Sequence, residues 1–143
     1  MSTESIEALK IEVRSFIEAN LAPELRVGNR KDLPKKALGK WIQALGERGW
    51  ITPEWPKEYG GGGLDRKHAA VLMKELKSFK APIVGGFGIS MLGPTLLEFG
   101  TEEQKQVWLP GMALGERLGC FGLTEPGFGS NPGGMETRAR RSG

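Results

Sequence analysis

The stretch "GCFGLTEPGFGSNPGG", residues 119–134, marks the point at which the fold is expected to change. It begins with a short apolar run, passes through Thr124-Glu125-Pro126 and ends in a glycine-rich turn. An apolar run bounded by glycine and proline is typical of a β-strand that leads into a turn. Glycines also let the main chain approach a ligand closely, because they carry no Cβ. The sequence before this stretch has helical periodicity instead, so the chain is predicted to divide near residue 118.

Residues 1–117 are predicted to form an all-α domain of about five helices. Asp32 and Asp65 stand where they can cap the second and third helices, and Thr101 with Gln104 forms a capping box for the last one. Pro110 is expected to end that last helix. The first three helices are each identified by apolar residues at helical spacing: Ile6, Leu9, Val13, Phe16 and Ile17; Leu38, Trp41, Ile42 and Leu45; Ala69, Leu72, Met73 and Leu76.

Two segments interrupt or modify this helical pattern. "WITPEWPKEYGGGGLD", residues 50–65, combines prolines, aromatic residues and consecutive glycines, and it predicts a long loop with aromatic anchors. Residues 81–100 are nearly uncharged and rich in small residues, which indicates that the backbone lies close to another helix or to a ligand. Tight packing between buried helices and a ligand alongside explain this equally well. Both interpretations stay open at the level of the sequence.

Composition and charge exclude several classes of protein. The 143 residues are 38% hydrophobic and 26% charged, as in a globular domain, and they contain no apolar segment of the roughly 20 residues that a membrane span needs. One cysteine and one histidine exclude a disulfide framework and a Cys/His zinc site. The net charge of +3 comes from residues spread along the chain, which does not indicate a nucleic-acid partner. Without a signal-peptide pattern at the N-terminus, we expect a cytoplasmic protein.

Three stretches together resemble the N-terminal part of the acyl-CoA dehydrogenase family. They are "GWITPEWPKEYGGGGLD" (49–65), "MLGPTLLEFGTEEQKQVWLPGMALGE" (91–116) and "CFGLTEPGFGSNPGGMETRA" (120–139). The last stretch resembles the family signature and is nearest to the glutaryl-CoA dehydrogenase branch. The resemblance implies a mainly α fold, with the family's N-terminal helical domain in residues 1–117. Residues 118–143 would be the first strand and turn of an incomplete middle β-domain.

The resemblance also implies a function, a cofactor and site residues. The family removes hydrogen from the α and β carbons of an acyl-CoA thioester: a carboxylate takes the α-proton and FAD takes the β-hydride. The residues expected to bind FAD are Phe121, Gly122, Leu123 and Thr124 along the flavin ring, and Gly129 and Ser130 near the pyrophosphate. Ser130 would also lie near the CoA arm and so contact the substrate. Backbone N–H groups and glycines in such a turn suit a phosphate group.

Two features depart from the family pattern. Asn131 stands where the family usually has Asp, and no Arg or Lys occurs between Ala81 and Gln104 to meet the second carboxylate of a glutaryl group. A plain or branched acyl chain beside Ile89, Met91 and Leu92 is therefore expected.

The family's catalytic glutamate belongs to a later domain, so no catalytic or metal-binding residue is assigned and the chain alone is expected to be inactive. The resemblance further implies an electron-transfer flavoprotein or similar acceptor, and a homo-oligomeric full-length enzyme. The alternative is a non-catalytic helical interaction module derived from the same fold.

Overall fold

A computed structural model describes residues 3–26 and 32–142. The helical part contains α1 (Thr3–Asn20), α2 (Lys35–Glu47), α3 (Arg66–Ser78), α4 (Gly93–Phe99) and α5 (Glu102–Ala113). A π-helix, η4 (Gly88–Leu92), leads directly into α4, and short 3₁₀ turns occur at η1 (Pro23–Arg26), η3 (Lys57–Tyr59) and η5 (Pro132–Gly134). The predicted mainly α architecture is confirmed.

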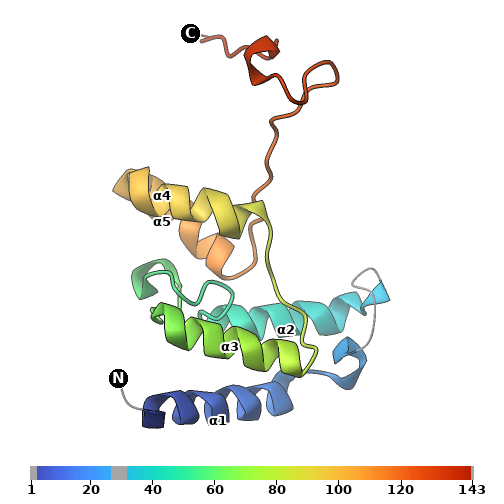
Figure 1. The fold of residues 1–143 in the computed structure, drawn as a ribbon, viewed down its shortest axis with the longest axis vertical. Helices are drawn as coiled ribbons and strands as arrows, with labels where there is room; N and C mark the ends of the chain where they lie inside the picture. Colours follow the sequence, from blue (N-terminus) through green and yellow to red (C-terminus); the bar gives the residue numbers. More distant parts are fainter. Residues whose placement is uncertain (1–2, 27–31, 143) are drawn as a thin grey trace.

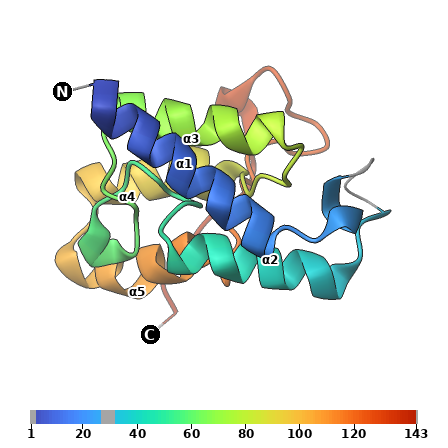
Figure 2. The same ribbon diagram turned by 90° about the horizontal axis from the view of Figure 1, so that it is seen from below.

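The helices form a body from which the end of the chain projects. α1 packs across α2 and α3, while α4 and α5 lie on the side of that group away from α1 (Figures 1 and 2). After α5 the chain passes the π-helix, and its last part extends away from the helical body (Figure 1). The predicted domain boundary after residue 117 stays a prediction, since the last helix ends at Ala113.

The main core lies between α1, α2 and α3. Its members are apolar residues at the helical spacing seen in the sequence, and burying them supplies the main stabilisation of the helical body. The buried residues of this cluster are Leu9, Val13, Ile17, Leu21, Leu25, Trp41, Leu45, Trp50, Ile51, Leu72, Leu76 and Ala81. Met73, one of the apolar residues whose spacing identified the third helix, is only partly buried and packs against the cluster.

A buried carboxylate joins α1 to α3. Glu75 accepts hydrogen bonds from Arg14 Nε at 2.8 Å and Nη2 at 3.2 Å. The hydrogen bond from Arg14 holds the pKa of the Glu75 carboxyl below its ordinary value. Because the Glu75 side chain is buried and Arg14 is half exposed, the arginine supplies the counter-charge from the surface side.

The loop 50–65 is anchored by its aromatic residues, as predicted. Trp55 and Tyr59 are buried with Leu109, Met112 and Ala113 of α5 in a second cluster. The Tyr59 hydroxyl donates to the Glu102 carboxylate at the start of α5, at about 3 Å from either oxygen. This loop therefore connects the α1–α3 group to α5.

The ends of the helices match the sequence in part. Asp65 caps α3 by accepting from the N–H groups of Lys67 and His68, and Thr101 with Gln104 forms the predicted capping box of α5. Asp32 does not cap α2: that helix begins at Lys35 after Pro34, and no side chain caps it. The expected break at Pro110 is also wrong, since α5 continues through it to Ala113. A proline costs one hydrogen bond, which burial of Leu109 and Met112 offsets here.

The strand expected at the start of the second part is not formed. Within residues 32–142 and 3–26 the only β-pairing is an isolated bridge between Glu125 and Phe128. Residues 118–124 make no backbone hydrogen bond to any described residue. A strand is defined by hydrogen bonds to a neighbouring strand, and residues 118–124 have no such neighbour among the described residues.

Candidate functional site

The candidate site begins where the projecting segment crosses the π-helix. Gly119 and Gly88 are in backbone contact, so that a Cβ on either residue would collide with the other. Gly93, one turn further along, lies against the side-chain ring of Trp55, so a Cβ on Gly93 would collide with that ring. At Gly88 and Gly93 the small residues therefore serve tight packing within the chain, whereas a Cβ on Gly85 or Gly86 would meet nothing within 4 Å, which leaves the second interpretation, a ligand alongside, open there.

Apolar side chains stand on both sides of this crossing. The rings of Phe87 and Phe121 lie 5.7 Å apart between centroids and are tilted by 42°. Both remain about half exposed, at 54% and 53%. Leu92 on the π-helix and Leu123 further along the projecting segment are also exposed, at 40% and 47%. The segment thus presents an aromatic and aliphatic surface that the helical body does not cover.

Residues 125–137 form a loop held by its own hydrogen bonds. The backbone groups of Glu125 and Phe128 pair with each other at 3.0 and 3.3 Å. The Glu125 carboxylate accepts the backbone N–H groups of Glu136 and Thr137, each at 2.8 Å. These bonds, the one from Glu136 first, hold the pKa of the Glu125 carboxyl below its ordinary value. Glu125 therefore joins the two ends of the glycine-rich turn.

The turn itself presents free backbone donors to the exterior. Gly129 and Ser130 are exposed, and neither donates a backbone hydrogen bond to a described residue. A Cβ at Gly122, Gly127 or Gly129 would meet nothing within 4 Å. Open space in front of unpaired N–H groups is what an anionic ligand needs in order to approach the main chain.

The residues predicted from the sequence are therefore brought together only in part. Phe121, Gly122, Leu123 and Thr124 lie on one extended segment, and Gly129 and Ser130 lie on the adjoining loop, all of them exposed. Of the three residues expected beside an acyl chain, Ile89 packs against both core clusters, whereas Met91 and Leu92 are exposed. Neither of the cavities beside Pro82 and Ile83 is lined by Ile89, Met91 or Leu92.

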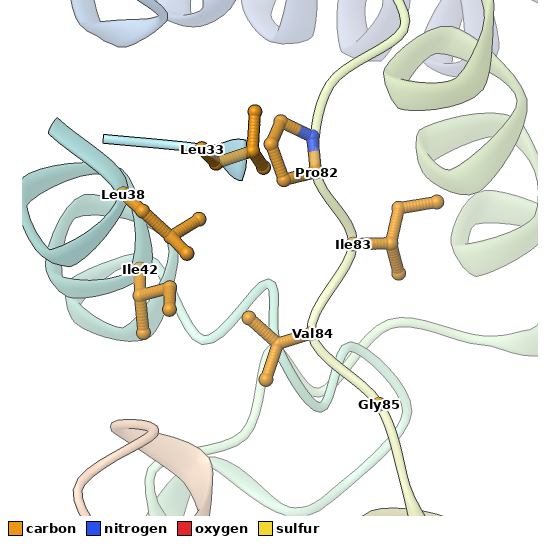
Figure 3. A pocket seen from close by; sticks show the side chains of 7 residues that line it. All are labelled: Leu33, Leu38, Ile42, Pro82, Ile83, Val84 and Gly85. Atoms are coloured by element: carbon orange, nitrogen blue, oxygen red, sulfur yellow. The ribbon is translucent and has the colours of Figure 1, made fainter. Parts of the chain in front are cut away.

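An apolar cavity lies elsewhere, between α2 and the connection from α3 to the π-helix. Its volume is about 250 Å³. Figure 3 shows side chains from the start of α2 facing the connecting segment across this space. Its lining residues are Leu33, Leu38, Ile42, Pro82, Ile83, Val84 and Gly85.

Two contacts of the site could not be predicted from the sequence. Phe87 is the partner of the Phe121 ring, and its only signal was a single aromatic residue within a run of small ones. Glu125 holds the loop closed, and nothing in its spacing from Glu136 and Thr137 indicates that contact. Both contacts depend on where the chain turns.

Across residues 3–26 and 32–142, no three His, Cys, Asp or Glu side chains are placed to hold a metal ion. In the same described part of the chain, no helix is long and apolar enough to span a bilayer.

Comparison with known proteins relates this geometry to one family. The family profile described as "Acyl-CoA dehydrogenase, N-terminal domain" matches residues 3–116. A 3-(aryl)acrylate reductase of Clostridium sporogenes is 36% identical over 99% of the chain and 37% of its own length. The mitochondrial short-chain specific acyl-CoA dehydrogenase of Bos taurus is 34% identical, over 98% of the chain and 34% of its own length. The chain thus spans about a third of the relatives that it matches.

Solved structures agree with the sequence comparison. The ChsE4-ChsE5 complex from Mycobacterium tuberculosis superposes with a TM-score of 0.73 at 31% identity, covering 100% of the chain and 36% of the matched one. An acyl-CoA dehydrogenase complexed with FAD from Bacillus anthracis gives a TM-score of 0.61 at 30% identity, covering 94% and 23%. None of these relatives is named a glutaryl-CoA dehydrogenase, so that part of the resemblance stays a prediction.

Proposed function

The chain belongs to the acyl-CoA dehydrogenase family, and on that premise we propose that it is the N-terminal portion of an FAD-dependent enzyme that dehydrogenates acyl-CoA thioesters. Residues 1–117 are its all-α domain, and residues 118–143 begin its middle β-domain. One observation carries the proposal: an apolar segment and a loop with free amides follow directly on the helical domain that defines the family. The FAD-bound relative from Bacillus anthracis supports the choice of cofactor.

The residues present suit one wall of a flavin site. Phe121, Gly122, Leu123 and Thr124 supply apolar surface and a hydroxyl along an extended segment, which suits the flat face of a ring system. Gly129 and Ser130 supply unpaired N–H groups with open space before them, which suits a pyrophosphate. Ser130 also supplies a hydroxyl on that side of the loop, where it would contact the CoA arm.

FAD bound here would supply the acceptor for the hydride from the β carbon. The residues that would orient it and shield one of its faces from water are Phe121, Gly122, Leu123 and Thr124. The Thr124 hydroxyl and the neighbouring amides are donors that would stabilise charge on the reduced ring. Glu125 acts indirectly, since its carboxylate sets the shape of the loop that carries Gly129 and Ser130.

We propose further that these 143 residues alone do not catalyse the reaction. Abstraction of the α-proton requires a carboxylate free to accept it, and such general bases typically contribute about 10²–10⁴-fold. Glu125 is engaged by two amide donors that lower its pKa, and Glu102 is engaged by Tyr59 and Gln106. Carboxylates stabilised in this way are weak bases.

We propose the substrate and partners of the full-length enzyme from its family membership. An acyl-CoA with a plain or branched chain is the proposed substrate, and an electron-transfer flavoprotein or similar acceptor is the proposed partner. The ChsE4-ChsE5 neighbour is a complex of two named components, which supports an oligomeric full-length enzyme. The cytoplasmic location stays a prediction, and the bovine relative is named as mitochondrial.

Flavin binding by the purified chain tests the site. FAD is titrated with the chain while flavin fluorescence and visible absorption are recorded, and we expect weak, saturable binding. Ser130→Ala and Thr124→Ala should each reduce it. Ser142→Ala is the matched control, because Ser142 is exposed and lies outside the loop.

A panel of acyl-CoAs with FAD and an artificial electron acceptor then tests activity. We expect no turnover above the flavin blank. Turnover that falls on Ser130→Ala would refute the proposed inactivity. A folded chain that does not bind FAD at all would favour the non-catalytic interaction module.

A further inference from the structure

Three polar side chains form a row of hydrogen bonds where α1 and α3 begin. Ser5 Oγ lies 3.3 Å from His68 Nε2, and His68 Nδ1 lies 2.8 Å from Asp65 Oδ2. The contacts of Ser5 with His68 and of Arg14 with Glu75 show that the two helices run in parallel. The first turn of α1 therefore lies beside the start of α3 (Figure 2).

The carboxylate decides which atoms of this row donate. An ionised carboxylate can only accept hydrogen bonds, so the hydrogen between Asp65 and His68 belongs to Nδ1. The backbone N–H of His68, and after it the imidazole, hold the pKa of the Asp65 carboxyl below its ordinary value, which keeps it ionised at neutral pH. In the neutral imidazole, Nε2 then has no hydrogen and accepts the Ser5 O–H. Ser5 thus donates to a nitrogen that can take its proton.

The imidazole is held in this orientation by a residue that is itself fixed. Asp65 caps α3, since its Oδ1 accepts the N–H of Lys67 at 2.9 Å and that of His68 at 3.0 Å. Its Oδ2 remains for the imidazole. The His68 side chain is 16% exposed, whereas Ser5 is exposed. The base is therefore oriented and mostly shielded, and the hydroxyl lies where a reacting molecule can reach it.

The start of α1 places a positive potential beside Ser5. This helix has 18 residues and begins at Thr3, within one turn of Ser5. The first N–H groups of a helix have no acceptor inside the helix, and they give that end a partial positive charge. Negative charge that develops on a carbonyl oxygen attacked by Ser5 would lie in this field.

We propose that Ser5, His68 and Asp65 form a site that hydrolyses small carboxylic esters. Ser5 Oγ attacks the carbonyl carbon while its proton passes to His68 Nε2. The bond from that carbon to the alcohol oxygen then breaks, and the proton passes from His68 to the leaving alcohol. Water, deprotonated by His68 in turn, attacks the acyl group on Ser5, which releases the carboxylic acid and restores the hydroxyl. Asp65 keeps the imidazole in the tautomer that both steps need.

The arrangement of the site limits its substrates. Because Ser5 is exposed, an acyl group bound to it has little surface to pack against, so the substrate is a small ester such as an acetate. The site is separate from the proposed flavin site at residues 121–130, and neither proposal depends on the other.

Hydrolysis of p-nitrophenyl acetate by the 143-residue chain tests the proposal. We expect release of p-nitrophenolate above the buffer blank. Ser5→Ala and His68→Asn should each lower that rate by about 10²-fold, the lower end of what a positioned general base contributes. Ser15→Ala, at an exposed serine further along the same helix, is the matched control and should leave the rate unchanged.

Two results of this assay overturn the proposal. One is hydrolysis no faster than the blank. The other is a rate that falls in His68→Asn but stays unchanged in Ser5→Ala, because the imidazole would then attack the ester directly.

Asp65→Asn separates the orienting role of this residue from its role as a helix cap. Asparagine caps helices about as well as aspartate, so the far-UV circular dichroism and melting temperature should stay close to those of the wild type. Its side-chain amide can donate to Nδ1 and so favours the opposite tautomer. The rate should therefore fall as it does in Ser5→Ala, and a wild-type rate in this variant would contradict the assignment.

A fluorophosphonate probe tests the nucleophile in the unaltered chain. Ser5 Oγ should bond to phosphorus as fluoride leaves, and peptide mapping by mass spectrometry should locate the adduct on Ser5. Labelling should be lost in His68→Asn. If Ser5 stays unlabelled, or is labelled no more than Ser15 in the same sample, the proposal is wrong.

Discussion

The α1–α3 interface should respond strongly to the loss of one leucine. Leu76 on α3 is 1% exposed and packs in the cluster with the apolar residues of α1. Leu76→Ala removes three carbons, which costs roughly 2–3 kcal/mol at about 0.8 kcal/mol for each buried methylene. The cavity left behind adds to this, so the expected total is about 2–5 kcal/mol. In urea the unfolding midpoint should fall by roughly 1–3 M.

Leu118→Ala is the matched control for this experiment. Leu118 is 88% exposed, so the same chemical change should alter the free energy of unfolding by less than about 0.5 kcal/mol. Urea unfolding followed by tryptophan fluorescence and far-UV circular dichroism measures both variants. A midpoint for Leu76→Ala equal to that of the wild type, or equal costs for the two variants, would refute the placement of α3 in the core.

Three further outcomes follow from local contacts. Because the pKa of the Glu125 carboxyl is lowered in the folded loop, its contribution is complete above the unfolded pKa and is lost as pH falls through the lowered value. The protection of the Glu136 and Thr137 amides, taken relative to their intrinsic exchange rates at each pH, should therefore fall in acid, and Glu125→Gln should remove that dependence. Residues 120–123 make no backbone hydrogen bonds, so their amides should exchange at nearly unprotected rates in a dilute sample, and strong protection would contradict the structure. Gly93→Val should lower the melting temperature because its side chain would collide with a buried tryptophan ring, and an unchanged value would disprove that contact.

The helices themselves could be predicted because their determinants are local. Apolar spacing places the core residues of α1 and α3, and the caps at Asp65 and Thr101 depend on residues two or three positions away. The errors occurred where a distant contact opposes a local preference. Helix α5 passes through Pro110 because its neighbours are buried against the loop 50–65.

The candidate site was less accessible to prediction than the helices. The sequence predicted a binding role for residues 119–134, and that role stays a prediction because the family profile ends before them, at residue 116. The sequence could not indicate that Phe87 meets Phe121 or that Glu125 closes the loop. These contacts join residues 11 to 34 positions apart, and no periodicity encodes them.

The sequence by itself determined the helical class and the family, whereas the domain boundary placed after residue 117 stays a prediction. Class and family follow from the sequence because periodicity, capping and a signature motif are properties of neighbouring residues. Only the tertiary structure decided that the glycines at 88 and 93 serve contacts within the chain, and that residues 118–124 stay unpaired. Packing distances and strand pairing depend on which backbone lies opposite, and that is fixed only when the helices have assembled.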